Sequence, residues 1–152
     1  MLYFSYPQPV KAMSQDFSKR FAIVVNKDLP SWQVLNTVGH IAAYLGSKME
    51  SSFDTGEYFV TKDKKGHPRN SQYPIVTFSA TAKELQKFIE LVRESNLLYL
   101  GFVPEMVETT DDAELEKVIG GKLDSEIEYY GIGVFGENEK VKPLFKKFSL
   151  WK

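Results

Sequence analysis

The stretch that decides the fold runs from residue 21 to residue 49 and reads FAIVVNKDLPSWQVLNTVGHIAAYLGSKM. Its first five residues form a continuous apolar run, which is typical of a β-strand covered on both faces. Pro30 ends the extended segment, and Ser31 is placed to cap a helix that the next residues predict from Trp32 to Met49. A buried strand that leads directly into a long helix predicts an α/β domain.

The predicted helix has two different faces when its residues are rotated by 100° each. One face is an ordinary apolar core stripe of Val34, Leu35, Val38, Ile41, Ala42, Leu45 and Met49. The other face carries amides, hydroxyls and an imidazole but no charge, namely Gln33, Asn36, Thr37, His40, Tyr44 and Ser47. A solvated helix face usually carries Lys and Glu. We therefore expect the polar residues from Gln33 to His40 to line one partly exposed cleft at the end of the first strand.

The rest of the chain continues the alternation of strands and helices. Strands are predicted at 57–61, 75–80, 98–103 and 129–135, and shorter helices at 111–119 and 141–145. Thr81 and Glu84 form a capping box in front of another helix, whose core stripe is Leu85, Phe88, Ile89 and Val92. This order predicts a single three-layer α/β domain with a mixed β-sheet of about four strands and helices on both faces.

The composition sets limits on the kind of protein. With 152 residues and 43% hydrophobic content, the chain is expected to form one compact domain at 19–152, preceded by an N-terminal extension at 1–18. The absence of cysteine excludes disulfides and thiolate sites. A net charge of −1 argues against a surface coated with nucleic acid. No signal peptide or membrane span is apparent, so we expect a soluble cytoplasmic protein without a membrane partner.

Three segments together resemble a known superfamily. They are FAIVVNKDLPSWQVLNTVGHIAAYLG at 21–46, HPRNSQYPIVTFSAT at 67–81 and YYGIGVFG at 129–136. The combined pattern is similar to the type II peptidyl-tRNA hydrolases, and most similar to their branch of unknown function, the domain-of-unknown-function family 2000. In that branch a strand is followed by Asp-Leu and then by Asn before a histidine, as Asp28, Leu29, Asn36 and His40 follow here. The resemblance implies a peptidyl-tRNA hydrolase II-like fold over residues 19–150.

The resemblance also implies roles for single residues. His40 matches the histidine of the hydrolases and Asp28 matches their strand-end aspartate, so the two are the candidate catalytic acid–base pair. The lysine of the hydrolases falls on Gln33, and their glutamine falls on Thr37. Loss of the lysine removes the fixed positive charge that would orient a phosphate or polarise an ester carbonyl. Gln33 therefore favours a protein that binds over one that hydrolyses.

The residues leave open three functions, and with them the question of whether the protein is an enzyme. The first is a non-hydrolytic binding module for a small polar ligand or peptide, with Gln33, Asn36, Thr37 and Tyr44 as ligand-binding residues around His40. The second is a divergent hydrolase of peptidyl-tRNA or another ester or amide. The third is a protein-interaction module, and a homodimer is also left open. His40 can equally be a structural histidine, and Asp28 a plain turn residue.

Other signals are weak. The basic cluster Lys62, Lys64, Lys65, His67 and Arg69 is best explained as a solvated turn, so strong tRNA binding is not expected. Two histidines without a matched carboxylate predict no metal site, and no motif points to a cofactor. Gly131, Gly133 and Gly136 alternate within a predicted strand, which indicates close backbone packing and not a phosphate-binding loop.

Overall fold

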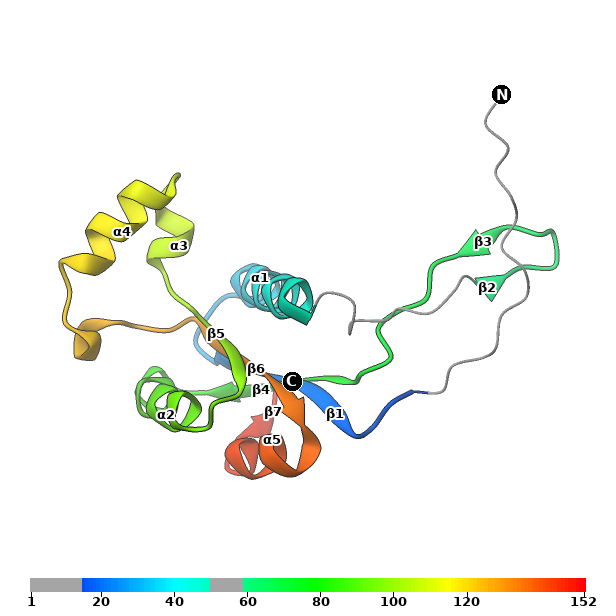
Figure 1. Ribbon diagram of the computed structural model, residues 1–152. Helices are drawn as coiled ribbons and strands as arrows, with labels where there is room; N and C mark the ends of the chain where they lie inside the picture. The colour runs from blue at the N-terminus through cyan, green and yellow to red at the C-terminus, as the bar shows by residue number, and fades with distance from the viewer. Residues whose placement is uncertain (1–14, 50–58) are drawn as a thin grey trace.

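The computed structural model in Figure 1 describes residues 15–49 and 59–152 and shows a mixed α/β fold. Its centre is a five-stranded sheet in the order β5-β6-β1-β4-β7, and β2 and β3 form a separate hairpin. The elements are β1 Lys19–Asn26, α1 Ser31–Met49, β2 Phe59–Val60, β3 Gly66–His67, β4 Ile75–Ala80, α2 Ala82–Glu94, β5 Leu98–Phe102, α3 Glu105–Glu108, α4 Asp112–Gly120, η2 Asp124–Glu126, β6 Gly131–Glu137, α5 Asn138–Phe145 and β7 Ser149–Leu150.

The central sheet is mixed, as the sequence predicts. Strand β1 pairs in parallel with β4 and antiparallel with β6, while β5 pairs antiparallel with β6 and β7 antiparallel with β4. Strands β1, β4 and β5 therefore share one direction. The strand with the continuous apolar run, β1, has neighbours on both sides, so its backbone groups are paired on both edges.

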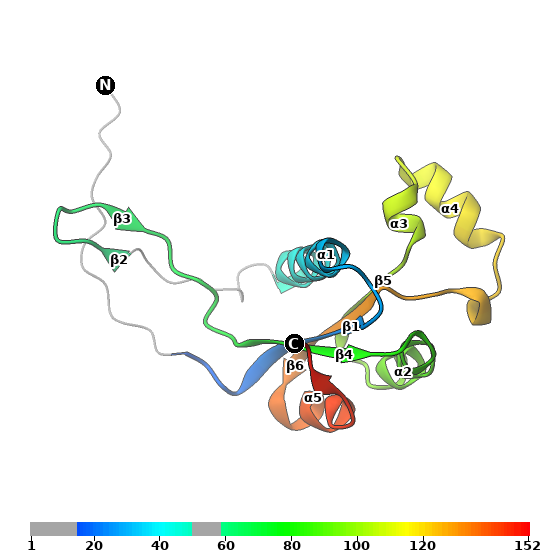
Figure 2. The ribbon, with the colours of Figure 1, turned by 180° about the vertical axis from the view of Figure 1, so that it is seen from behind.

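Helices cover both faces of this sheet. Figures 1 and 2 show α1 on one side and α2 with α5 on the other. Side chains of alternate residues of β1 point to opposite faces of the sheet and pack into the core on each face. Phe21, Ile23 and Val25 pack with the buried residues of α1, whereas Ala22 and Val24 pack with those of α2 and α5.

Two glycines of β6 set how closely α1 approaches the sheet. A Cβ on Gly133 would lie 2.0 Å from Cγ2 of Ile41, and a Cβ on Gly131 would lie 2.7 Å from Cγ2 of Thr37. No side chain fits at either position while the helix stays where it is. The interpretation of these glycines as sites of close backbone packing is confirmed, and α1 lies directly on β6 for this reason.

Most predicted elements are found, with some differences. Strand β4 has the predicted bounds, and the capping box of Thr81 and Glu84 is confirmed with both reciprocal hydrogen bonds. The sheet has five strands where about four are expected, because β7 is only two residues long and too short for a periodic signal. Helix α3 is likewise a single unpredicted turn. Residues 1–14 of the predicted extension and residues 57–58 of the predicted strand at 57–61 lie outside the described residues.

The apolar stripe of α1 is narrower than expected. The angle of Leu35 on the helix predicts that it lies on the core face, but its side chain is 68% exposed. Helix α1 packs mainly on β1, β6 and β5. Among the described residues, the side of α1 that carries Leu35 lies outside these contacts, and this assignment to the core is wrong.

Candidate functional site

The predicted polar stripe of α1 divides between the core and the surface. Gln33 and Thr37 are 3% and 0% exposed, so the expectation that they line an open cleft is wrong. The Gln33 side-chain amide donates to Oδ1 of Asn36 at 3.3 Å and to Oγ1 of Thr37 at 3.4 Å. Because Gly131 lets the helix lie close to β6, Gln33 and Thr37 are enclosed between helix and sheet, whereas Asn36 at the margin is exposed.

The candidate catalytic pair is not joined by a contact. His40 is exposed, and its ring stacks on Phe102 with the ring centroids 5.0 Å apart and the planes 13° apart. Asp28 lies in the exposed turn after β1, where its backbone N–H donates to Oδ1 of Asn26. Within residues 15–49 and 59–152, no hydrogen bond links Asp28 to His40. The catalytic roles of these two residues stay a prediction.

Tyr44, one turn after His40, leads to a different site. It lines a hollow of about 430 Å³ beside β5, at one edge of the sheet. The hollow is formed by α1, α2, β5, α3, α4 and the segment that returns from η2 to β6. Most of its lining is apolar and includes Ile89, Leu100, Val103, Met106, Ile119 and Ile127. An apolar concavity of this size with a few polar groups is the usual form of a ligand site.

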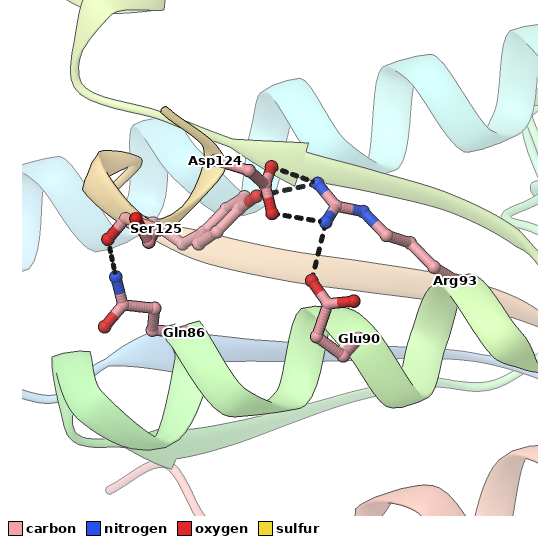
Figure 3. Close-up of polar contacts among 6 residues, drawn as sticks. Gln86, Glu90, Arg93, Asp124 and Ser125 are labelled. Atoms are coloured by element: carbon pink, nitrogen blue, oxygen red, sulfur yellow. Dashed lines mark hydrogen bonds and ion pairs between the residues drawn. The ribbon is translucent and has the colours of Figure 1, made fainter. Parts of the chain in front are cut away.

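The charged groups of this hollow are bound to each other. Arg93 donates from Nη1 to Oδ2 of Asp124 and from Nη2 to Oδ1, both at 2.7 Å, and Nη1 also reaches Oε1 of Glu90 at 2.7 Å (Figure 3). Nη2 lies 3.4 Å from the hydroxyl of Tyr129. The bidentate hydrogen bonds lower the pKa of Asp124 and raise that of Arg93. Since its donors already have partners, Arg93 is not free to bind an anion.

A second contact fixes the same wall of the hollow. The side-chain amide of Gln86 on α2 donates to the backbone carbonyl of Ser125 (Figure 3). Together with the pair of Arg93 and Asp124, this contact ties η2 to α2 at two points. Tyr129, which follows η2, is buried, and burial raises the pKa of its phenol. The hollow therefore has an ordered wall of tyrosine rings and paired charges.

Strand β5 forms the open side of this site. It reads LYLGF at 98–102, with no charge and no proline, and within the described residues its outer edge has no strand partner. Open edges of this length are usually protected by charges, proline or a covering segment. A Cβ on Gly101 would lie 2.6 Å from Cε1 of Tyr129, so a glycine is needed there to seat the tyrosine ring. The outer edge of β5 thus presents backbone groups that have no strand partner in the described part of the chain, next to an apolar hollow.

An acidic segment borders the hollow. Residues 105–128 contain nine acidic and two basic residues, a net charge of −7. Lys122, one of the two, is paired with the buried carboxylate of Glu105. Burial alone would raise the pKa of Glu105, but hydrogen bonds from Lys122 and from its own backbone outweigh this and lower it. The surroundings of the β5 edge are consequently negative.

Sequence reasoning found only Tyr44 among the residues of this site. The others are ordinary core types, or charges typical of a solvated face, and they come from five further segments of the chain. The only local signal is the lack of any protecting charge in the strand from Leu98 to Phe102.

Comparison with known proteins places the chain in a family. A family model described as a protein of unknown function, DUF2000, matches residues 19–152. The chain belongs to the DUF2000 family. A solved structure of a protein of unknown function from Agrobacterium tumefaciens strain C58 is similar to this chain, with a TM-score of 0.78 and 20% identity. The match covers 90% of this chain and 100% of that one, and at this identity it shows the fold alone.

The comparison with curated proteins finds no match. The link between this DUF2000 chain and the peptidyl-tRNA hydrolases stays a prediction. No helix within residues 15–49 and 59–152 is long and apolar enough to cross a membrane. In the same part of the chain, no group of three or more His, Asp or Glu side chains is placed to hold a metal ion.

Proposed function

We propose that this DUF2000 protein is a binding module that takes up an extended, basic peptide segment by strand addition along β5. The observation that carries the proposal is the uncharged outer edge of β5 beside the 430 Å³ hollow. An added strand would complete the backbone hydrogen bonds of the edge, and alternate side chains of that strand would enter the hollow.

The charges of the site support a basic partner. The bordering segment at 105–128 has a net charge of −7, and the one arginine in the lining is already held by Asp124 and Glu90. An acidic peptide would be repelled, whereas lysine or arginine side chains would be attracted and guided to the edge. The affinity for the peptide would come from backbone hydrogen bonds and from its apolar side chains, and the preference for basic over acidic peptides would come from the negative charge around the site.

The proposed ligand is a peptide, as one of the alternatives from the sequence, but the proposed site is the edge of β5 and not the polar face of α1. Tyr44 lines the hollow, and His40 stacks on Phe102 at the end of β5. Gln33 and Thr37 are sealed in the core and support α1. Nothing in these contacts assembles an acid–base pair within the described residues, and we expect purified protein to show little peptidyl-tRNA hydrolysis.

The test is a titration with a labelled peptide of alternating lysine and valine, followed by fluorescence anisotropy. We expect saturable binding that weakens by about tenfold or more when glutamate replaces lysine in the peptide. A peptide with N-methylated backbone amides keeps the side chains but loses the donors that strand addition needs, and it should not bind. Equal binding of the parent and N-methylated peptides would contradict the proposal.

A further inference from the structure

A different part of the molecule, around α5, contains two hollows whose charged lining residues are basic, in contrast to the acidic border of the hollow beside β5. One, of about 570 Å³, lies between α2 and α5 and is lined by Leu91, Lys140, Pro143, Leu144, Lys146 and Lys147. The other, of about 270 Å³, lies between α5 and the sheet and includes Arg20, Lys142 and Lys146. Lys146 lines both. Among the described residues that line either hollow, none is acidic.

The cations of the larger hollow are mostly without carboxylate partners. Residues 138–152 contain five lysines and one glutamate, a net charge of +4. Lys140 pairs with Glu137 at 3.4 Å, but both side chains are largely exposed. Within the described chain, Lys146 and Lys147 form no ion pair. Lys147 is within electrostatic range of Glu84, whose carboxylate is already bound by the capping box with Thr81.

Aromatic rings place the ammonium group of Lys147. Its Nζ lies 5.0 Å from the ring centroid of Phe148 and 5.9 Å from that of Phe88. Cation–π contacts at these distances favour a defined position of the charge over the freedom usual for a surface lysine. A lysine directly after a helix also stabilises its C-terminus, which accounts for Lys146 in part. It does not account for the apolar surface next to it.

The apolar surface of this hollow is exposed and does not belong to the core. Leu91 on α2 is 46% exposed, although Leu85, Phe88, Ile89 and Val92 of the same helix are buried. Pro143 and Leu144 of α5 lie across the hollow from it. An apolar strip that ends at unpaired cations matches a ligand with a hydrocarbon part and an anionic end.

We propose that the hollow between α2 and α5 binds an amphiphilic anion, an alkyl chain that carries a carboxylate or phosphate. The chain lies against Leu91, Pro143 and Leu144, and Lys146 and Lys147 hold the anionic group. The same chemistry is offered by a free amphiphile and by an acidic lipid in a bilayer. This site is separate from β5 and does not depend on peptide binding.

Calorimetric titration of the full chain with decyl phosphate, below its micelle concentration, tests this site. We expect saturable binding, and a loss of about tenfold or more in affinity for the double variant Lys146→Gln, Lys147→Gln. The matched control is Lys62→Gln, Lys117→Gln, which removes the same charge at two exposed lysines outside the hollow and should bind like the wild type. Circular dichroism of each variant checks that it is folded.

Three further probes decide the chemistry and the source of the ligand. Decyltrimethylammonium has the same chain with the opposite charge, and inorganic phosphate has the charge without the chain; neither should bind comparably. Vesicles of phosphatidylglycerol present the anion in a bilayer, and binding to them alone, lost in the Lys146 and Lys147 variant, would identify a lipid as the source. Equal binding of decyl phosphate and decyltrimethylammonium would overturn the proposal, as would undiminished binding of both decyl phosphate and vesicles by that variant.

Discussion

The hollow beside β5 and the hollow between α2 and α5 both have apolar linings, but the cations in the two linings differ in whether a carboxylate binds them. Arg93 at the first is held by two carboxylates at 2.7 Å, so its charge is used within the fold. Lys146 and Lys147 at the second have no such partner among the described residues. The groups that are available to bind a ligand therefore differ between the two hollows. The first site offers backbone groups and rings beside an acidic border, and the second offers free positive charge.

This difference shows why net charge is a poor guide to the partners of this protein. The chain as a whole has a charge of −1, but residues 105–128 carry −7 and residues 138–152 carry +4. A nearly neutral total hides two regions of opposite sign. A net charge of −1 argues only against a surface generally coated with nucleic acid, and it is compatible with a local basic surface such as the one around α5.

The largest effect is expected from closing the first hollow. Gly101→Val places a side chain where Cε1 of Tyr129 lies 2.6 Å from the Cβ position, so the ring or the strand must move. We expect a loss of about 1–3 kcal/mol in the free energy of unfolding, the usual cost of overpacking. Urea denaturation measures it. Gly120→Ala is the control, because apart from its chain neighbours and the backbone of its own helix no heavy atom lies within 4 Å of its Cβ position. Unchanged stability of Gly101→Val would show that the wall formed by Tyr129 is not fixed.

A smaller effect separates the paired cation from the unpaired one. Arg93→Gln removes two hydrogen bonds to Asp124, and because the pair is partly exposed we expect a loss of about 1 kcal/mol. Lys146→Gln removes no hydrogen bond or ion pair to the described residues and should stay within about 0.5 kcal/mol of the wild type. Thermal denaturation of both variants at neutral pH gives the comparison. Equal losses would remove the distinction between the two hollows.

The smallest effect concerns pH. The hydrogen bonds from Arg93 lower the pKa of Asp124 below its ordinary value of 3.8, so the folded state favours the ionised carboxylate. The resulting stability is complete above that value and is lost as the pH falls through the lower pKa of the folded state. Asp124→Asn should therefore be less stable than the wild type at pH 6, with a difference that shrinks under strongly acidic conditions. A difference that stays constant down to acid unfolding would contradict this account.

The sequence predicts the parts of the fold that depend on local patterns. The continuous apolar run of β1, the bounds of β4 and the capping box at Thr81 each follow from residues within one short segment. The exposure of Leu35 and the burial of Thr37 do not follow from such a local pattern. A helical wheel gives the angle of a side chain, but whether that side is covered depends on where the sheet lies beneath it. Here Gly131 and Gly133, about 90 residues further along the chain, bring β6 under Thr37 and leave Leu35 exposed.

The candidate sites were harder to predict for the same reason. The hollow beside β5 is formed by six segments, and its most telling feature, an edge that no described strand pairs with, depends on the strand order. The lysines in and directly after α5 are visible in the sequence, but whether Lys140 and Lys147 have a carboxylate nearby depends on the positions of Glu137 and Glu84, which only the structure gives.

Amide hydrogen exchange of β5 tests the central claim most directly. Exchange at Tyr99, Leu100 and Gly101 would be measured with and without the lysine–valine peptide, since newly formed hydrogen bonds slow the exchange of their donors. The account predicts that some of these amides become protected when the peptide is added, whereas the amides of β7 at the opposite edge of the sheet do not change. Peptide binding that leaves every amide of β5 unprotected would contradict strand addition at this edge.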